Sequence, residues 1–418
     1  MAANNLATST IVCKKGLAIL QNMLSFTEGV NRDYEMEFSS NQSRGYSPGQ
    51  TIQIRKPPRY TYRAGRVAVP QSTVQTTVPL TLQQGGTDMN LTSLDKTLLL
   101  QGKGDMLNAA IATVANEIDR QGLNLVLTSV ANAVGTPGTP PATAFAAVQL
   151  AGLANQKLDE LGAPRKDKKR SLIMSPALNT AMLAGFSGLF NSQAKLSDNY
   201  SSGMFMDAMG FRADMDQNVA THTNGTQVGG ATANAVNGAG QVGSLTNPAT
   251  PMTLNVNAAL TAGAGTAITR GTILTIANVF AVNPQSRITT GSLQQFVVQA
   301  DVLSGATTVS ILPGIIPSGA FQNVTTSPAN NATVTILGTL STGYPLSVLY
   351  HKDAFTMASV PLIMPEGGVI SAHQETDNGI TMRVIETYDS INDNFLLRID
   401  VLYGWLSTYQ ELATRVYI

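Results

Sequence analysis

The stretch that decides the fold is residues 46–82, YSPGQTIQIRKPPRYTYRAGRVAVPQSTVQTTVPLTL. Apolar or aromatic residues recur in it with a period of two, at Ile52/Ile54 and at Tyr60/Tyr62. This period is typical of β-strands and favours a long β-hairpin. The pair Pro57-Pro58 argues against a central strand, because proline has no amide hydrogen to donate to a neighbouring strand. We therefore expect an exposed hairpin within residues 41–90, which needs a surface beneath it to be stable.

The hairpin concentrates positive charge. Residues 38–87 contain no Asp or Glu, and five cations lie close together in them: Arg55, Lys56, Arg59, Arg63 and Arg66. These charges repel one another unless an acidic surface receives them. The span 366–411 has the opposite bias and includes Glu386, Asp389 and Asp393. The charge pattern therefore predicts contacts between subunits, in which the hairpin of one copy lies on the acidic C-terminal region of another.

The period changes after the hairpin. From Gly104 to about Ala133, apolar residues recur at three-, four- and seven-residue steps, namely Leu107, Ile111, Val114, Ile118 and Leu125. This stripe predicts an amphipathic helix about 45 Å long. A second helix is expected at Ala144–Leu161, where Gly162 and Pro164 end it. A buried strand at Leu172–Met174 is then expected to lead into a helix capped by Ser175, with Pro176 in its first turn.

A polar, Gly/Asn/Thr-rich segment interrupts this α/β body at about residue 216, and the body resumes at about 345. The segment predicts strands at Ile273–Val282, Gln295–Leu303, Thr307–Leu312 and Thr333–Leu337, with turns between them. We therefore expect residues 217–345 to be an inserted β domain. Helical and mixed structure is expected beyond it, followed by C-terminal strands that turn at residues 392–394.

The composition is that of a folded chain with few charges. Apolar residues make up 43% of the 418 residues, but charged residues make up only 12%, against roughly 25% in typical soluble proteins. A weakly charged surface suits a chain that is covered by copies of itself, although a compositional habit of the source organism would give the same values. The N-terminus is a poor signal peptide, and no stretch approaches the roughly 20 apolar residues that span a bilayer.

The sequence carries no recognisable catalytic, cofactor or metal motif. His222, His351 and His373 have no metal-ligand spacing, and we expect each to be a surface or capped histidine. Cys13 is the only cysteine, so no disulfide forms within one chain. The basic run 165–170 is either a contact for DNA phosphates or, as we favour, a solvated turn. We therefore expect no catalytic, cofactor-binding or metal-binding residue, although a hydrolase with an unrecognised site stays an alternative.

The order of these parts resembles the major capsid proteins of tailed bacteriophages, in particular the coat proteins of short-tailed phages that carry an inserted β domain. The resemblance rests on the collinear order of hairpin, long helix, second helix, strand, Ser-Pro helix and C-terminal strands. It also rests on four short segments, Gly210–Asp216, Tyr350–Phe355, Leu402–Trp405 and Ala413–Arg415. It covers nearly the whole chain and implies an α+β tailed-phage major capsid fold.

The resemblance implies seven segments. They are an N-terminal arm (1–40), the extended hairpin loop (41–90), a spine helix with part of the peripheral domain (91–135), the first part of the axial domain (136–216), the inserted β domain (217–345), the second part of the axial domain (346–375) and the C-terminal strands of the peripheral domain (376–418).

The resemblance also implies a function and a set of partners. The chain is expected to assemble with itself, as hexamers and pentamers, into the icosahedral shell around a phage's double-stranded DNA. Scaffolding and portal proteins are expected partners during assembly in the cytoplasm of the host bacterium, the packaged DNA is expected to be contacted non-specifically, and no membrane is involved. The alternative is a binding protein, such as a cell-surface adhesin or a tail or decoration protein, suggested by the Thr/Asn/Gly-rich β segment.

Overall fold

The chain folds as two units, each described here by itself. The computed structural model describes residues 17, 18, 20, 24–33, 51–68, 70–93, 103–139, 141, 144–186, 209–227, 235–258, 265–377 and 379–418. The first unit comprises residues 1–54, 79–122 and 355–406, and the second comprises residues 55–78, 123–354 and 407–418. The backbone therefore passes between the units at five points, after residues 54, 78, 122, 354 and 406.

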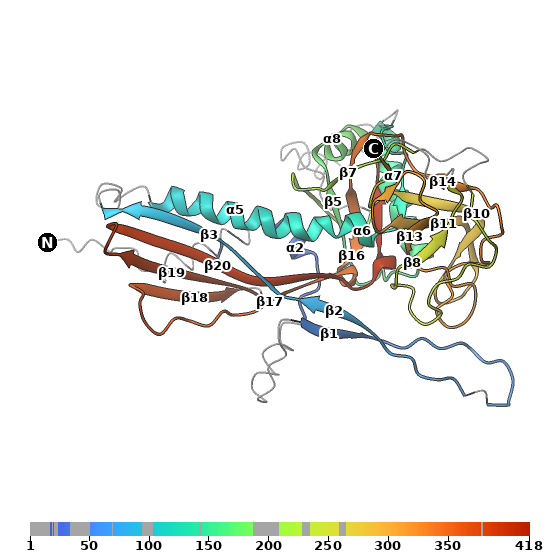
Figure 1. The fold of residues 1–418 in the computed structure, drawn as a ribbon, viewed down its shortest axis with the longest axis horizontal. Helices are drawn as coiled ribbons and strands as arrows, with labels where there is room; N and C mark the ends of the chain where they lie inside the picture. The colour runs from blue at the N-terminus through green and yellow to red at the C-terminus, as the bar shows by residue number, and fades with distance from the viewer. Residues whose placement is uncertain are drawn as a thin grey trace. The chain divides into compact units, whose positions relative to one another are not determined.

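The first unit is built on an antiparallel sheet of long strands. Its order is β17-β20-β19-β18, and β3 pairs with β20 on the side away from β19. The strands are β3 (Gln83–Thr92), β17 (Phe355–Ser359), β18 (Ser371–Asp377), β19 (Ile380–Asp389) and β20 (Asn394–Ser407). The long helix α5 (Lys103–Asn124) runs along β3 and β20 (Figure 1).

The apolar stripe of α5 is buried as predicted. Ile111, Val114 and Ile118 are all buried, whereas Thr113 on the opposite face is exposed. The side chain of Leu107 lies outside the described residues. The helix is shorter than expected, because α5 ends at Asn124 and a separate short helix α6 (Val126–Ser129) follows it.

A short N-terminal segment is fixed to α5. The buried carboxylate of Asp119 accepts hydrogen bonds from the Phe26 amide (3.2 Å) and the Thr27 amide (3.3 Å), at the first turn of α2 (Ser25–Glu28). Phe26 stacks on Trp405 with ring centroids 5.4 Å apart, and both rings reach Gly122, where no side chain would fit. The remainder of the expected N-terminal arm lies mostly outside the described residues.

The second unit contains a mixed sheet of order β4-β21-β16-β5-β6. Its strands are β4 (Ala133–Val134), β21 (Ala413–Val416), β16 (Ser347–His351), β5 (Arg170–Met174) and β6 (Arg212–Met215). Helices α7 (Ala144–Glu160) and α8 (Pro176–Phe186) share an apolar core with it. The predicted cap of α8 is confirmed, because the Leu178 amide donates to Ser175 Oγ at 3.3 Å.

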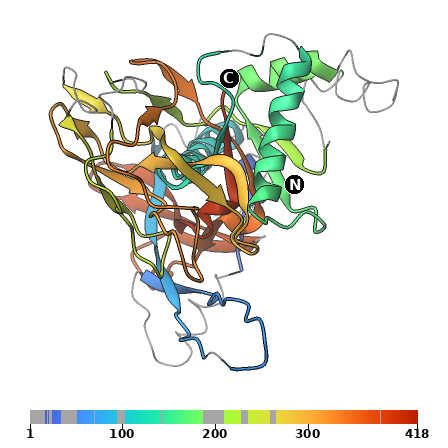
Figure 2. The same cartoon turned by 90° about the vertical axis from the view of Figure 1, so that its right-hand side faces the viewer.

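The segment 217–345 forms its own antiparallel sheet, of order β14-β10-β11-β13-β8. These strands are β8 (Met252–Asn255), β10 (Ile273–Val282), β11 (Thr289–Val298), β13 (Thr308–Leu312) and β14 (Val334–Ile336). Short strands β9 (Thr266–Ile268) and β12 (Val302–Leu303) pair with each other. Figure 2 shows the strands in yellow and orange beside the teal helix α7, and Lys157 Nζ of that helix donates to Ser292 Oγ at 3.0 Å.

The predicted strands of this segment are confirmed in kind, and one of them is shifted. The expected strand Ile273–Val282 is β10, whereas Gln295–Leu303 was wrong in its bounds: β11 starts at Thr289 and ends at Val298, and β12 is a separate short strand. The polar first half of β11 hides the start of the strand in the sequence. It is held by its pairing with β10, in which Val282 lies opposite Thr289.

The two ends of the segment meet. β7 (Thr221–Thr223) pairs with β15 (Gly343–Pro345), so that Thr221 lies opposite Pro345. The buried core between these ends contains only residues of the segment, from Val236 to Ile336. A segment whose ends are adjacent and whose core is its own has the anatomy of an inserted domain.

A buried guanidinium joins this segment to the mixed sheet. Arg415 on β21 donates to the carbonyl oxygen of Gly271 at 2.8 Å, and to those of Val126 and Leu127 at 2.9 and 2.7 Å. It also donates to the hydroxyl of Tyr417 at 3.2 Å. The bond to Gly271 therefore links the segment to the sheet by one charge-assisted hydrogen bond in addition to its two covalent connections, and the bonds to Val126 and Leu127 link the sheet to α6.

The C-terminal part contains more strand than expected. Residues 347–359 form the strands β16 and β17 with a single 3₁₀ turn (Lys352–Ala354) between them, where helical and mixed structure was expected. The end of the chain is also divided between the units, because β21 pairs with β16 in the second unit whereas β18 to β20 belong to the first. Pairing partners distant in sequence decide both outcomes.

The buried stripe of α5 yields a first prediction. Ile111→Asp places a carboxylate where no water reaches, so the free energy of unfolding should fall by about 3–5 kcal/mol. Thermal unfolding followed by circular dichroism measures the loss. Thr113→Asp makes the same substitution on the exposed face and should leave the melting temperature nearly unchanged. Equal melting temperatures for the two variants would contradict the burial.

The adjacent ends of the inserted segment yield a second prediction. Residues 217–345 expressed alone should give a β-type circular dichroism spectrum and a cooperative thermal transition. Ile276→Asp, in the centre of its core, should abolish that transition. A random-coil spectrum for the unmodified fragment would show that the segment depends on the rest of the chain.

Candidate assembly surface

The predicted hairpin is present with shorter strands than expected. β1 (Thr51–Lys56) pairs with β2 (Thr76–Thr81), and Ile52, Ile54 and Leu80 pack in an apolar cluster with Ala358 and Val360. Residues 57–68 and 70–75 form an irregular loop, so the strand expected around Tyr60 and Tyr62 was wrong. The cause lies at its start, because Pro57 and Pro58 cannot donate to a ladder and stop β1 at Lys56.

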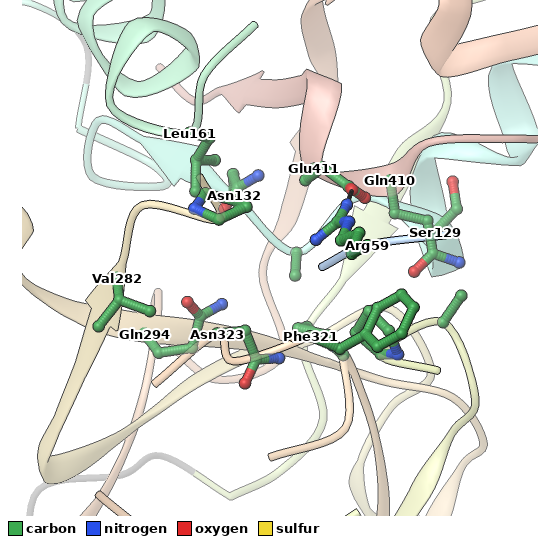
Figure 3. A pocket seen from close by; sticks show the side chains of 15 residues that line it. Arg59, Ser129, Asn132, Leu161, Val282, Gln294, Phe321, Asn323, Gln410 and Glu411 are labelled. Carbon is green, nitrogen blue, oxygen red and sulfur yellow. Dashed lines mark hydrogen bonds and ion pairs between the residues drawn. The ribbon is translucent and has the colours of Figure 1, made fainter. Parts of the chain in front are cut away.

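The base of this loop is held by the second unit's own residues. Arg59 Nη2 lies 2.6 Å from Glu411 Oε1, and both side chains are about one-third exposed, at 30% and 27%. The guanidinium also lies over the ring of Phe321, 5.6 Å from its centroid. Figure 3 shows Arg59 between these two partners. Glu411 belongs to the 3₁₀ turn Gln410–Leu412, which with Tyr409 is called the C-terminal turn, and Phe321 belongs to the inserted segment.

Two further contacts hold the same part of the loop. Lys56 Nζ lies 5.3 Å from the centroid of the Tyr409 ring, and burial lowers the pKa of this lysine. Arg287, in the turn between β10 and β11, donates from Nη2 to the carbonyl oxygen of Tyr60 at 2.9 Å. The loop base is thus bound on both sides, to the C-terminal turn and to the inserted segment.

The outer part of the loop, residues 61–68, is called the distal loop. Unlike the loop base, it is exposed to solvent. Tyr62 is 92% exposed and Val67 is 80% exposed. Arg55, Arg63 and Arg66 are also exposed, and Arg63 Nη1 donates only to the loop carbonyls of Gly65 and Val67, each at 2.5 Å. Aromatic, aliphatic and cationic groups are therefore presented together on one loop.

The predicted acidic partners lie in the first unit. Asp389 and Asp393 shape the turn between β19 and β20, where Asp389 Oδ1 accepts from the Ile391 amide at 2.9 Å and Asp393 Oδ1 accepts from Ser93 Oγ at 2.5 Å. The hydrogen bonds from Asn392 and Ser93 hold the pKa of Asp389 and Asp393, respectively, below the usual range. Both carboxylates therefore stay charged on an exposed turn.

Glu386 lies further along β19. It is half-buried and accepts a hydrogen bond from Ser371 Oγ at 3.4 Å. The cations of the hairpin loop belong to the second unit and these three acids to the first, so the predicted contact between them stays a prediction.

A small pocket that opens to solvent lies beside Arg59. Prolines and side-chain amides line much of it (Figure 3). The amides of Asn132, Gln294 and Asn323 donate to backbone carbonyl oxygens at 3.1, 2.8 and 2.7 Å. These amides support the loops around the pocket, and the Arg59–Glu411 pair is the one ion pair among the residues that line it.

The histidines are more buried than the sequence suggested. His222 is 4% exposed and His351 is 1% exposed, so of the two expected environments, surface or capped, both histidines have the capped one. His351 Nε2 lies 2.8 Å from Asp167 Oδ2, and His222 Nε2 lies 3.2 Å from Thr269 Oγ1. Each lies in a strand that is covered by distant parts of the chain. Within the described ranges, no group of three His, Cys, Asp or Glu side chains is arranged to hold a metal ion.

The basic run 165–170 forms an exposed turn with one buried member. Residues 165–169 are exposed, whereas Arg170 is fully buried and pairs with Asp159 at 2.6 Å. Asp167, the acid within the run, is bound to His351. The structure agrees with the solvated turn that we favoured. None of the described helices is long and apolar enough to cross a membrane.

These features define the class of protein: an α+β phage capsid fold, in which a long helix lies on an antiparallel sheet, a hairpin loop is exposed, and the segment 217–345 forms its own β-sheet. The chain belongs to the family described as P22 coat protein - gene protein 5, whose model matches residues 1–413. A comparison with curated protein sequences found no match.

Solved structures of phage and virus-like particles are similar to the chain. A chain of Mycobacterium phage Che8 is 12% identical, with 94% of this chain and 90% of that chain covered and a TM-score of 0.48. The CUS-3 coat protein I-domain is 30% identical over 27% of this chain and 100% of that chain, with a TM-score of 0.20. A virus-like particle from Pyrococcus furiosus is 7% identical, with 97% of each chain covered and a TM-score of 0.41. The family assignment rests on the family model.

The environment of His222 yields a third prediction. Burial, and then the nearby charge of Arg415, lower the pKa of His222 from 6.5 to about 4. Between these two pH values the unfolded chain binds a proton that the folded chain does not, so stability falls as the pH falls through this window. The loss from this one residue should be about 1.4 kcal/mol per pH unit, or about 2 kcal/mol from pH 6.5 to pH 5.

Urea unfolding at several pH values measures this slope. His222→Gln does not titrate, so the stability of this variant should fall less steeply on acidification than that of the unmodified chain. Parallel slopes for the two proteins between about pH 6.5 and pH 4 would contradict a neutral, buried His222.

Proposed function

We propose that copies of this chain assemble, as hexamers and pentamers, into a closed icosahedral shell around the double-stranded DNA of a tailed phage. Membership of the coat protein family makes the chain a structural capsid protein. The observation that carries the mode of assembly is the distal hairpin loop, which presents Tyr62, Val67 and two arginines to solvent. Large apolar side chains displayed together on an exposed loop are typical of a surface that a partner covers.

The partner surface that we propose is acidic and belongs to a neighbouring copy. The exposed turn between β19 and β20 carries Asp389 and Asp393 in their charged forms, together with Ile391, which is 90% exposed. A loop with arginines and apolar groups is complementary to a turn with carboxylates and an apolar group. Each exposed pair contributes only about 0–1 kcal/mol, but a shell repeats the pair in every subunit.

The coat family implies a place in the virion. We further propose that assembly takes place in the cytoplasm of the host bacterium, with scaffolding and portal proteins as partners, and that the enclosed DNA is contacted without sequence preference. The family match gives no support to the adhesin alternative or to an enzyme.

Negative-stain microscopy of the expressed protein tests the proposal. Closed shells, or long polyheads with a capsomer lattice, are expected. A chain that stays a soluble monomer with all head proteins of its phage present would contradict it.

The distal loop yields a fourth prediction. Arg63→Glu combined with Arg66→Glu should leave a folded subunit that forms few closed shells, because the loop then repels the acidic turn. Added salt should weaken assembly of the unmodified protein through screening, since the Debye length falls to about 3 Å at 1 M salt.

Lys166→Glu combined with Lys168→Glu is the matched control, with the same change of charge on another exposed turn. It should assemble normally. Normal shells from the double arginine variant, at the usual yield, would contradict the charge complementarity while leaving the capsid function intact.

A further inference from the structure

The loop base is bound by residues of its own chain, whereas the distal loop is exposed. The two parts therefore have different roles, one in positioning the loop and one in contacting a neighbouring subunit. Arg59 was expected from the sequence to meet a neighbour's acid, together with Arg63 and Arg66. In the folded chain Arg59 already has an acid, Glu411 of its own C-terminal turn, at 2.6 Å. Arg63 and Arg66 have no acid within ion-pair distance in the described part of the second unit.

We propose that the inserted β domain and the C-terminal turn form a clamp that holds the hairpin loop in cis, and that Arg59 is the positioning residue of this clamp. The clamp residues are Arg59, Glu411, Phe321, Arg287, Lys56 and Tyr409. The distal loop, residues 61–68, is the part left for a neighbouring subunit. The clamp itself does not depend on the proposed function, whereas the role of the distal loop rests on it.

The geometry supports a clamp more than an incidental surface pair. Nη2 of the Arg59 guanidinium is bound by the carboxylate of Glu411, and the central carbon of the same group lies over the Phe321 ring, so the group has an ionic and a cation–π partner. Arg287 binds the next residue along the loop through a backbone carbonyl, which fixes the main chain as well as the side chain. Lys56 on Tyr409 fixes the strand end before the two prolines.

Pro57 and Pro58 make this clamp effective. Each proline fixes its own φ angle and restricts the residue before it, so the short segment between Lys56 and Arg59 has few conformations. When both ends of such a segment are held, the direction in which the distal loop leaves the unit is set before any neighbour arrives. Preorganisation of this kind reduces the entropy lost on association.

Charge exchange distinguishes a clamp in cis from a contact between subunits. Arg59→Glu and Glu411→Arg each place like charges opposite each other, and both changes in one chain restore an opposite pair. For a clamp in cis, the doubly changed chain forms shells, each single variant is defective, and coexpression of the two single variants gives no rescue.

For a contact between subunits, coexpression of the two single variants restores shells. The loop of an Arg59→Glu chain then meets the C-terminal turn of a Glu411→Arg neighbour, and opposite charges face each other again across the interface. That result would overturn the proposal.

Limited proteolysis of unassembled subunits gives a readout that does not need shells. The carbonyl of Tyr60 is bound by Arg287, so chymotrypsin cleaves between Tyr60 and Thr61 only after the loop base leaves the clamp. Both single variants should be cleaved there severalfold faster than the unmodified chain, and the doubly changed chain at the original rate. Cleavage after Tyr62, in the exposed distal loop, should not change in any of them and serves as the internal control.

Arg66→Glu is the matched variant for this experiment, because it makes the same change of charge outside the clamp. It should leave cleavage at Tyr60–Thr61 unchanged while it reduces shell formation. Unchanged cleavage in Arg59→Glu would overturn the clamp. If the unmodified chain forms no shells but the cleavage pattern is as expected, the clamp stands and the proposed function fails.

Discussion

The second unit depends on one buried guanidinium. Arg415 is completely enclosed. Its two terminal nitrogens donate to the carbonyl oxygens of Gly271, Val126 and Leu127 and to the Tyr417 hydroxyl, whereas its Nε has no hydrogen-bond partner among the described residues. An arginine cannot shed its proton, so every one of these acceptors is needed to offset the loss of its hydration. The carbonyls come from the inserted domain and from helix α6, and both must be in place for the last strand of the mixed sheet to be stable.

This requirement explains other features around Arg415. His222 lies close enough to the guanidinium for its pKa to be lowered, and it is kept neutral in a strand that closes the ends of the inserted domain. The inserted domain is therefore part of the folding of the host sheet, and β21 brings with it the C-terminal turn that carries Glu411.

Features set by neighbours in sequence were predictable, and features set by distant pairing were not. The stripe of Ile111, Val114 and Ile118 and the cap at Ser175 follow from local spacing and local hydrogen bonding. Strand β10 was predicted with its observed bounds because it is apolar and β-branched over most of its length. The partner of Arg59, by contrast, lies 352 residues away, and no local pattern relates the two.

Burial of the histidines was missed for the same reason. His351 is covered because β16 lies between β5 and β21, three segments that are far apart in the chain. From the sequence, Pro57 and Pro58 were expected to exclude a central strand and to leave an exposed hairpin. In the structure they end the strand outright, and this converts an expected long ribbon into a short ladder with a loop. The positive charge of the loop could be read from its composition. Which of its residues are bound and which are exposed could not, because the binding partners, Glu411 and Arg287, are distant in sequence.

The five backbone passages between the units have a consequence for damage to an assembled particle. In a protein whose domains are joined by one linker, a single cut releases one of them. Here the exposed hairpin loop lies within the second unit, between the passages after residues 54 and 78. A cut in this loop leaves all five passages intact. A nicked subunit therefore does not lose either unit, because each of the two fragments still contains residues of both units.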